Sequence, residues 1–412
     1  AGLGPPQRQG VRTFMPPTKT FERLYEGETG GISFEIHHIP SETEDQCAVW
    51  LPQEKVLLSA DAVYESFPNV YALRGTRFRN PMIWAQGVDR LREFNADILI
   101  PHHGHPVEGA DQISKLLTDY RDAIQFVHDQ TLRYMNKGYT SDEIKEVVTM
   151  PTRLQNHPWL GEFYGSYKHS IPAICVGYLG WYQGDPITLE PTPWVERAQR
   201  YVDMMGGRDT VLAKARDALH GGDAQWAAEL ATWVVRVNKS DAEARAVKAD
   251  ALRMWAYNQK NATWRNWGLT SALELDGELD QAGGGMVLGS PDQVKGFPLS
   301  AIMTVMTVRL KAEESWDTRI RVVFETTDSN EGCALEVRRG VCQFFAMPTG
   351  DRDATVKFNR PFVLQWIFGK ITFEDALAAG NISVDGDASV VSTFLSKFEQ
   401  FNEATNISIA VR

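Results

Sequence analysis

The sequence has few basic residues, few cysteines and no long apolar run, and each shortage excludes a class of protein. Lys and Arg number 42 against 53 Asp and Glu, giving a formal charge of −11. This charge argues against a nucleic-acid partner, because phosphates bind to basic surfaces. Four cysteines are too few for a disulfide scaffold. No apolar run approaches the roughly 18 residues that cross a bilayer, so no membrane span is expected.

The composition is that of a globular protein large enough for several cores. Of the 412 residues, 43% are apolar and 10% aromatic. At roughly 150 residues per domain, this length predicts two to three domains. Local composition divides the chain into an α/β zone at 1–110, a helical zone at 111–282 and an α+β zone at 283–412.

The first zone alternates short strands with a helix. Strands are predicted over 32–39, 47–51 and 55–61, and the last of these is apolar and ends on Asp61. A helix is predicted over 81–95, followed by a buried strand over 96–101. A strand–helix–strand order of this kind indicates an α/β layer.

The second zone reads as helices throughout. A long amphipathic helix is predicted from Asp111 to Gly138, and Thr140-Ser141-Asp142-Glu143 is typical of a helix N-terminus. Residues 215–228 have the helix–turn–helix pattern of a tetratricopeptide-type hairpin, which alone predicts a packed bundle and not a solenoid.

The third zone begins at the glycines of 283–285, which predict a flexible connection. Strands are predicted over 319–325 and 335–337, and helices over 362–368 and 394–401. This mixture predicts a separate α+β module.

Three of the nine histidines lie in Pro101-His102-His103-Gly104-His105-Pro106, directly after a predicted buried strand. Side chains at the carboxyl ends of such strands face the crevice in which α/β proteins bind ligands. The acidic loop Ser41-Glu42-Thr43-Glu44-Asp45-Gln46 and the strand-end Asp61 are candidates to join them around a cation such as zinc. The alternatives are a hydrogen-bonded surface turn and solvated carboxylates.

The segment Leu73-Arg74-Gly75-Thr76-Arg77-Phe78-Arg79 places three arginines within six residues. Guanidinium groups bind oxyanions such as sulfate or phosphate through paired hydrogen bonds. A solvated loop on an acidic protein is the competing interpretation.

Taken in order, these motifs resemble the alkyl sulfatases of the metallo-β-lactamase superfamily. The resemblance extends through Val127-His128-Asp129-Gln130-Thr131, Tyr164-Gly165-Ser166-Tyr167-Lys168-His169 and Tyr178-Leu179-Gly180-Trp181-Tyr182 to Gly380-Asn381-Ile382-Ser383-Val384. It implies a partial metallo-β-lactamase αββα sandwich, an all-helical dimerisation domain and a sterol-carrier-protein-like α+β domain. The implied partners are an alkyl sulfate substrate and a second copy of the chain.

The resemblance implies two zinc ions and assigns roles to individual residues. Glu44 matches the acid on the first zinc, Asp61 the bridging acid and His103 the histidine on the second zinc. His38 competes with Glu44 as a ligand, and His102 and His105 compete with His103, which the following glycine favours.

Three further residues are implied in the handling of the substrate. Arg74 matches the residue that holds the sulfate. His169 and Tyr178 lie in segments that in the family reach over the active site, where sulfate contact or protonation of the leaving group is expected.

The superfamily motif H-x-H-x-D-H is absent, since His37-His38 is followed by Ile39-Pro40. Three protein ligands are too few for two ions. We therefore expect the chain to be the carboxyl-terminal part of a longer enzyme, with a degenerate non-catalytic relative as the alternative. The start at Ala1, without an initiator Met, favours the first interpretation.

The expected reaction is zinc-dependent hydrolysis of alkyl sulfate esters to an alcohol and inorganic sulfate. One alternative is a metallo-β-lactamase-fold hydrolase of another ester, such as a lactone or phosphodiester. Another is a non-catalytic lipid-binding or dimerisation protein. Four Asn-x-Ser/Thr sequons, at Asn238, Asn261, Asn381 and Asn406, slightly favour a periplasmic or secreted location.

Overall fold

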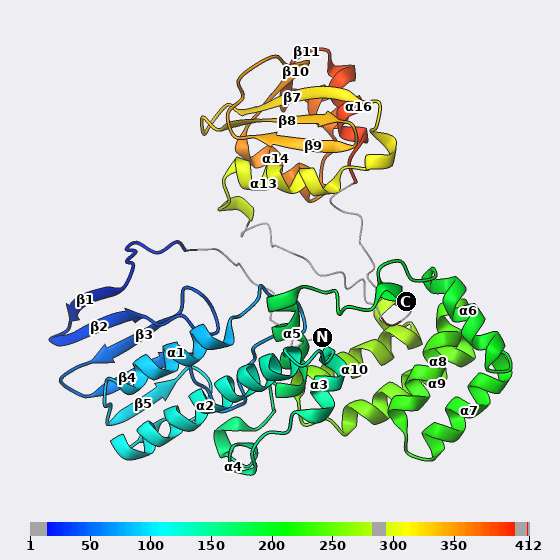
Figure 1. Ribbon diagram of the computed structural model, residues 1–412. Helices are drawn as coiled ribbons and strands as arrows, with labels where there is room; N and C mark the ends of the chain where they lie inside the picture. The colour runs from blue at the N-terminus through cyan, green and yellow to red at the C-terminus, as the bar shows by residue number, and fades with distance from the viewer. Residues whose placement is uncertain (1–14, 282–293, 400–409, 411–412) are drawn as a thin grey trace. The chain divides into compact units, whose positions relative to one another are not determined.

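The computed structural model describes residues 15–281, 294–399 and 410 (Figure 1). The chain divides into two compact units. The first contains Lys19–Gln281 together with residue 410, and the second contains the described residues from 294 to 399. The α/β and helical zones therefore lie in one unit, and the α+β zone forms the other.

A six-stranded sheet carries the α/β zone, with its strands side by side in chain order. The strands are β1 (Leu24–Thr29), β2 (Ile32–His38), β3 (Cys47–Leu51), β4 (Val56–Ala60), β5 (Ile98–Pro101) and β6 (Val107–Glu108). All neighbours are antiparallel except β4 and β5, which are parallel because α1 (Pro81–Arg92) connects them as a crossover. The predicted strand–helix–strand unit is confirmed.

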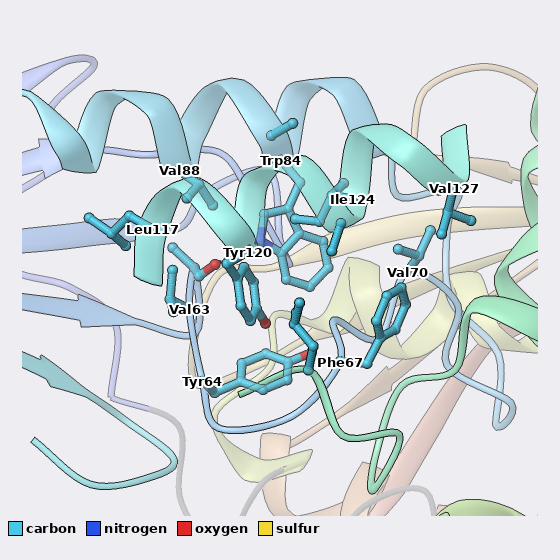
Figure 2. Close-up of a cluster of buried hydrophobic side chains, with 14 of the residues drawn as sticks. Val63, Tyr64, Phe67, Val70, Trp84, Val88, Leu117, Tyr120, Ile124 and Val127 are labelled. Carbon is cyan, nitrogen blue, oxygen red and sulfur yellow. Dashed lines mark hydrogen bonds between the residues drawn. The ribbon is translucent and has the colours of Figure 1, made fainter. Parts of the chain in front are cut away.

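Helices α1 and α2 (Ala110–Met135) pack on this sheet and on each other. Helix α1 begins where the sequence signals it, because the Asn80 side chain accepts hydrogen bonds from the first turn and proline follows. Three large rings fill the space beneath the helices: Trp84 and Tyr120 are fully buried, and Tyr64 is 3% exposed. The Tyr64 ring lies 6.3 Å from Trp84 and 6.2 Å from Tyr120 (Figure 2).

Burial along the strands shows that the helices cover one face of the sheet. In β4, Leu57 is fully buried while its neighbours Val56 and Leu58 are half-buried. In β5, Leu99 is fully buried between the half-buried Ile98 and Ile100. One sheet with helices on one face is the part of an αββα sandwich that the predicted fold class specifies.

The helical zone continues the first unit. Its elements are α3 (Ser141–Val147), α4 (Thr152–Gln155), α5 (Tyr167–Leu179), α6 (Trp194–Met204), α7 (Arg208–His220), α8 (Ala224–Val237), α9 (Ala242–Tyr257), α10 (Ala262–Asp276) and α11 (Glu278–Gln281). The capping box at Thr140 is confirmed, because its side chain and that of Glu143 satisfy each other's main-chain amides. The predicted hairpin is α7 and α8, which pack against each other.

The second unit is a five-stranded sheet with helices. Its strands are β7 (Arg319–Thr326), β8 (Gly332–Arg338), β9 (Val341–Phe345), β10 (Ala354–Phe358) and β11 (Ile382–Gly386), in the order β11-β10-β7-β8-β9. Its longer helices are α13 (Leu299–Met306), α14 (Arg360–Ile367), α15 (Phe373–Ala378) and α16 (Ala388–Ser396). The α+β prediction is confirmed.

One helix prediction in this unit is wrong. The helix expected over 394–401 is the end of α16, which stops at Ser396. The chain then becomes extended because Phe398 forms a β-bridge with Leu310 and the Lys397 carbonyl accepts the Lys311 amide. Residues 400–401 and the glycines of 283–285 lie outside the described residues. Among the helices that the structure describes, none is long and apolar enough to cross a membrane.

Candidate functional site

The parallel pairing of β4 and β5 brings two predicted ligands together. Ala60 and Pro101 are partners in this register, so the residues that follow both strands lie at the same edge of the sheet. There Asp61 Oδ1 lies 2.7 Å from His103 Nδ1. The His103 side chain is 76% exposed, and no hydrogen bond of its Nε2 occurs among the described residues.

A second imidazole–carboxylate pair lies on the same loop. His105 Nδ1 lies 2.7 Å from Glu65 Oε2. Gly104 separates the two histidines with a φ of +125°, and a Cβ at this position would lie 2.8 Å from the Glu65 Cβ. A glycine is therefore required for the loop to pass this close to Glu65. Because both histidines have a carboxylate partner, the choice of His103 as ligand stays a prediction.

The backbone is strained immediately before Asp61. Ala60 has a φ of +49°, in the left-handed region that costs a non-glycine residue about 1 kcal/mol or more. The strand register shifts between Leu58 and Ala60, which indicates a β-bulge. Bulges of this kind redirect a side chain at a strand end, and here the redirected residue is Asp61.

The acidic loop between β2 and β3 buries Glu42 and leaves Glu44, the predicted ligand, exposed. Glu44 is exposed, and its main-chain carbonyl, not its carboxylate, contacts His38 Nε2 at 2.7 Å. Glu42 is 9% exposed and its Oε1 accepts a 2.7 Å hydrogen bond from Arg79 Nη1. The structure thus places Glu42, two residues earlier, on the inner side of the loop.

Glu42 is also the glutamate that interacts electrostatically with the predicted ligands. Burial raises the pKa of the Glu42 carboxyl above its ordinary value, the Arg79 guanidinium opposes this shift, and the Asp61 carboxylate adds to it. His103 acts on the same group in the lowering direction. Glu42 therefore lies within electrostatic range of the Asp61–His103 pair, a role that the sequence, which names it only as one of the carboxylates of the acidic loop, did not assign to it.

The acidic loop and the arginine loop enclose a cleft of about 330 Å³. The arginine loop is defined here as residues 74–79. Phe78 and Ile83 give the cleft apolar walls, and Glu42 and Arg79 give it polar ones. Arg74 is exposed and has no ion-pair partner among the residues that the structure describes, whereas Arg79 is committed to Glu42.

Tyr178 on α5 forms a hydrogen-bond chain with α2. Its hydroxyl lies 2.8 Å from His128 Nε2, and His128 Nδ1 lies 2.8 Å from Asp129 Oδ1. A carboxylate only accepts, so His128 Nδ1 carries a proton and donates it to Asp129. His128 Nε2 accepts from the Tyr178 hydroxyl when the ring carries one proton and donates to the Tyr178 oxygen when it carries two. Phe78 of the arginine loop lies edge-on to the Tyr178 ring at 5.9 Å and against the bare backbone of Gly177.

His169, on the same helix, faces the helical zone. Its Nδ1 accepts a 2.8 Å hydrogen bond from the Trp264 indole, and its buried Nε2 has no hydrogen-bond partner. Burial lowers the pKa of His169 to about 4, so the ring is neutral at pH 7. Nothing in the described contacts joins His169 to Asp61 or His103.

The predicted site is therefore assembled in part. Asp61 and His103 meet, Tyr178 contacts the arginine loop through Phe78, Glu44 is exposed at the wall of the cleft, and His169 faces the helical zone. Across residues 15–281, 294–399 and 410, no group of three His, Cys, Asp or Glu side chains is arranged to hold a metal ion. His128 carried a signal that the sequence interpretation did not use: it is a polar residue, 6% exposed, within the apolar stripe of α2.

Three family models match successive parts of the chain. The metallo-beta-lactamase superfamily model matches residues 4–105, the alkyl sulfatase dimerisation model residues 140–278 and the alkyl sulfatase C-terminal model residues 287–408. The sequence is 40% identical to a linear primary-alkylsulfatase of a Pseudomonas species, over 100% of this chain and 79% of the relative. An alkyl/aryl-sulfatase of Saccharomyces cerevisiae is 30% identical over 98% of this chain and 63% of its own length.

The fold also matches a solved structure. A stereoselective inverting sec-alkylsulfatase from a Pseudomonas species superposes with a TM-score of 0.86 at 30% identity, covering 96% of this chain and 63% of that one. The chain thus spans about four-fifths of one relative and slightly less than two-thirds of the others named here.

Proposed function

Since the chain belongs to the alkylsulfatase family of the metallo-β-lactamase superfamily, we propose that the protein hydrolyses alkyl sulfate esters to an alcohol and inorganic sulfate. The observation that carries the proposal is the Asp61–His103 pair at the edge of β4 and β5, beside a cleft bordered by the arginine loop. Measuring the turnover of dodecyl sulfate, a lactone and a phosphodiester side by side tests this proposal. Faster turnover of the lactone or the phosphodiester than of dodecyl sulfate would favour hydrolysis of another ester.

Metal binding is the general property of the superfamily, and we propose zinc as the ion. The donor types fit, because zinc accepts imidazole and carboxylate. The number does not fit, because the contact pair Asp61 and His103 cannot hold two ions even with Glu42 added.

Zinc content tests this proposal independently of activity. His103→Ala should lower the zinc bound per protein, measured by elemental analysis after gel filtration. Glu42→Gln and Glu44→Gln then separate the two glutamates. We expect Glu42→Gln to lower the zinc content and Glu44→Gln to leave it unchanged. The reverse result would identify Glu44 as the zinc ligand.

We propose that Arg74 binds the sulfate group. Arg79 is paired with Glu42, whereas neither Arg74 nor Arg77 has a carboxylate partner among the described side chains, so Arg77, which lines the cleft, is the competing candidate. Arg74→Lys keeps the charge but loses the paired donors, and Arg74→Met loses both. Both variants should raise KM, and the rise should be larger in the methionine variant, at tenfold or more over the unmodified protein.

We propose that, when the S–O bond is the one that breaks, Tyr178 supplies the proton that the leaving alkoxide needs, in preference to His169. Cleavage of the C–O bond releases sulfate, which needs no proton. Tyr178 is 44% exposed next to the arginine loop, whereas the free nitrogen of His169 is buried. Tyr178→Phe should lower kcat on dodecyl sulfate far more than on an aryl sulfate, because a phenolate leaves without protonation. Equal losses on both substrates would show that Tyr178 has a structural role.

A homodimer through the helical zone is the proposed assembly, because the dimerisation family model covers residues 140–278. Light scattering of the purified protein tests this, with a mass near 92 kDa expected for two chains of 46.2 kDa. A monomeric mass at micromolar concentration would contradict it.

A further inference from the structure

A second cavity, of about 400 Å³, lies in the helical zone between α8 and α9. Its walls include Trp233, Leu252 and Trp255, together with the cationic side chains of Arg236 and Lys248. None of these residues belongs to the site at β4 and β5, so the cavity is a separate feature of the first unit.

Lys248 is a buried cation whose head forms no ion pair with any side chain that the structure describes. It is 8% exposed, and its Nζ donates a 2.7 Å hydrogen bond to the main-chain carbonyl of Ala410. Burial lowers the pKa of Lys248 to about 8, and repulsion from Arg236 contributes in the same direction, while Glu274 opposes it. An ammonium group in this position is stabilised by any anion that enters the cavity.

Arg236 is the second such cation. Its guanidinium carbon lies 3.9 Å from the ring centroid of Trp194 and 4.8 Å from that of Trp233. Its buried Nε has no acceptor, and no ion pair of Arg236 occurs within the described part of the chain. Because both contacts are to ring faces, they give its N–H donors no acceptor, and since Nε is buried, a bound oxyanion would be contacted by the terminal nitrogens.

Among the described residues around the cavity, the cations Lys248, Arg236 and Arg197 outnumber the carboxylates Glu229 and Glu274. Burial lowers the pKa of Arg236, and repulsion from Arg197 adds to this shift. Glu229 also lines the cavity, but it is exposed and accepts a hydrogen bond from Gln225 Nε2 at 2.8 Å, so it does not neutralise the buried heads. The cavity therefore combines a positive end with aromatic and aliphatic walls.

We propose that this cavity binds a monoanionic amphiphile, with its carboxylate or sulfate head at Lys248 and Arg236 and its short aliphatic tail against Trp233, Leu252 and Trp255. The head replaces the missing counter-charge, and the tail gains the apolar contacts of the walls. The size fits, because pockets for small ligands begin at about 300 Å³.

The wall of the cavity gives a spectroscopic readout. Trp255 stacks on Trp264 at 6.1 Å and 13°, and Trp264 donates its indole proton to His169. A ligand bound against Trp255 should therefore shift the indole N–H resonances of both Trp255 and Trp264 in a ¹H–¹⁵N spectrum.

The test is calorimetric and NMR titration of the full chain with octanoate, octyl sulfate, inorganic sulfate and octylammonium, all below their micellar concentrations. The two octyl anions should bind, and inorganic sulfate should bind at least tenfold more weakly. Octylammonium should not bind. The comparison of octanoate with octyl sulfate identifies the preferred head group.

Lys248→Met should weaken octanoate at least about tenfold, as expected for the loss of a charged hydrogen bond. Lys214→Met, at an exposed position on α7, is the matched control and should not change the affinity. If circular dichroism shows that Lys248→Met does not fold, Arg236→Gln takes its place. Unchanged affinity in a folded variant, or octylammonium binding as tightly as octanoate, would overturn the proposal, as would a variant that alters only the monomer–dimer equilibrium.

Discussion

Replacing Arg79 by methionine should destabilise the sheet in a way that depends on pH. The Arg79 and Glu42 side chains are 14% and 10% exposed, and the same Arg79 nitrogen also donates to the Asn69 carbonyl at 2.6 Å. Without the guanidinium, Glu42 must stay charged in a buried site or take up a proton. Breaking a buried pair from one side costs about 3–5 kcal/mol.

Protonation limits this loss and fixes its pH dependence. Protonating a carboxyl with an ordinary pKa of 4.5 at pH 7 costs about 3.4 kcal/mol, at about 1.36 kcal/mol per pH unit. The folded pKa of Glu42 is raised, so its folded form binds the proton more readily than the unfolded chain does. In the Arg79→Met variant, the contribution of Glu42 to the free energy of unfolding is therefore kept below pH 4.5 and lost as the pH rises through the folded pKa. We expect a loss of about 3.4 kcal/mol at pH 7 and about 0.7 kcal/mol at pH 5, plus about 1 kcal/mol at both for the Asn69 carbonyl.

Hydrogen exchange with mass spectrometry of peptides from β3, β4 and α1 measures the local free energy of opening at each pH. The matched control is Arg79→Met in a Glu42→Gln background, which should lose only the roughly 1 kcal/mol of the Asn69 contact. A loss that is the same at pH 5 and pH 7 would refute the role assigned to the Glu42 charge.

Three further substitutions test other contacts. Burial lowers the pKa of His169 to about 4, so Trp264→Phe, which removes the indole donor and shortens the covering ring, should raise this pKa toward 6.5 only as far as water reaches the imidazole, as followed by NMR titration. Because the unfolded chain binds this proton below pH 6.5 and the folded protein does not until about pH 4, the variant should lose less stability between these pH values. Gly165→Ala places a Cβ 2.3 Å from the Pro68 carbonyl oxygen and should cost about 1–3 kcal/mol in thermal unfolding, and no loss would mean that the 66–70 loop moves freely. Lys55→Gly relieves a φ of +53° in an exposed turn and should stabilise by about 0.5–1 kcal/mol, whereas a loss would contradict the left-handed geometry.

The regular elements could be predicted from the sequence because their signals are local. The apolar run at Lys55–Asp61 gave β4, Asn80-Pro81 gave the start of α1, and Thr140 gave the start of α3. The proximity of Asp61 and His103 also followed, since both come directly after buried strands. Each of these inferences depends on periodicity or on a cap within a few residues.

The loops of the site could not be predicted in the same way. Glu42 and Glu44 are indistinguishable by composition, and Arg79 on a distant segment determines which one is buried. The contact between His128 and Tyr178 joins residues 50 positions apart on two helices, and helical periodicity does not specify which helices pack together. The error at 394–401 has the same origin, since the bridge to Leu310 is a long-range contact.

The β4–α1–β5 crossover gives the site an unusual resistance to cleavage of the chain. The Asp61–His103 contact closes a ring of the polypeptide, and the arginine loop lies within that ring. Arg74 and Arg77 are exposed, so a trypsin-like protease has access to the loop. A cut there leaves Asp61 and His103 on separate fragments that are still held together by the paired strands and the buried face of α1. Nicked protein should therefore migrate intact on gel filtration while its two halves separate only on denaturation, which offers a route to reconstituting the site from two independently labelled fragments.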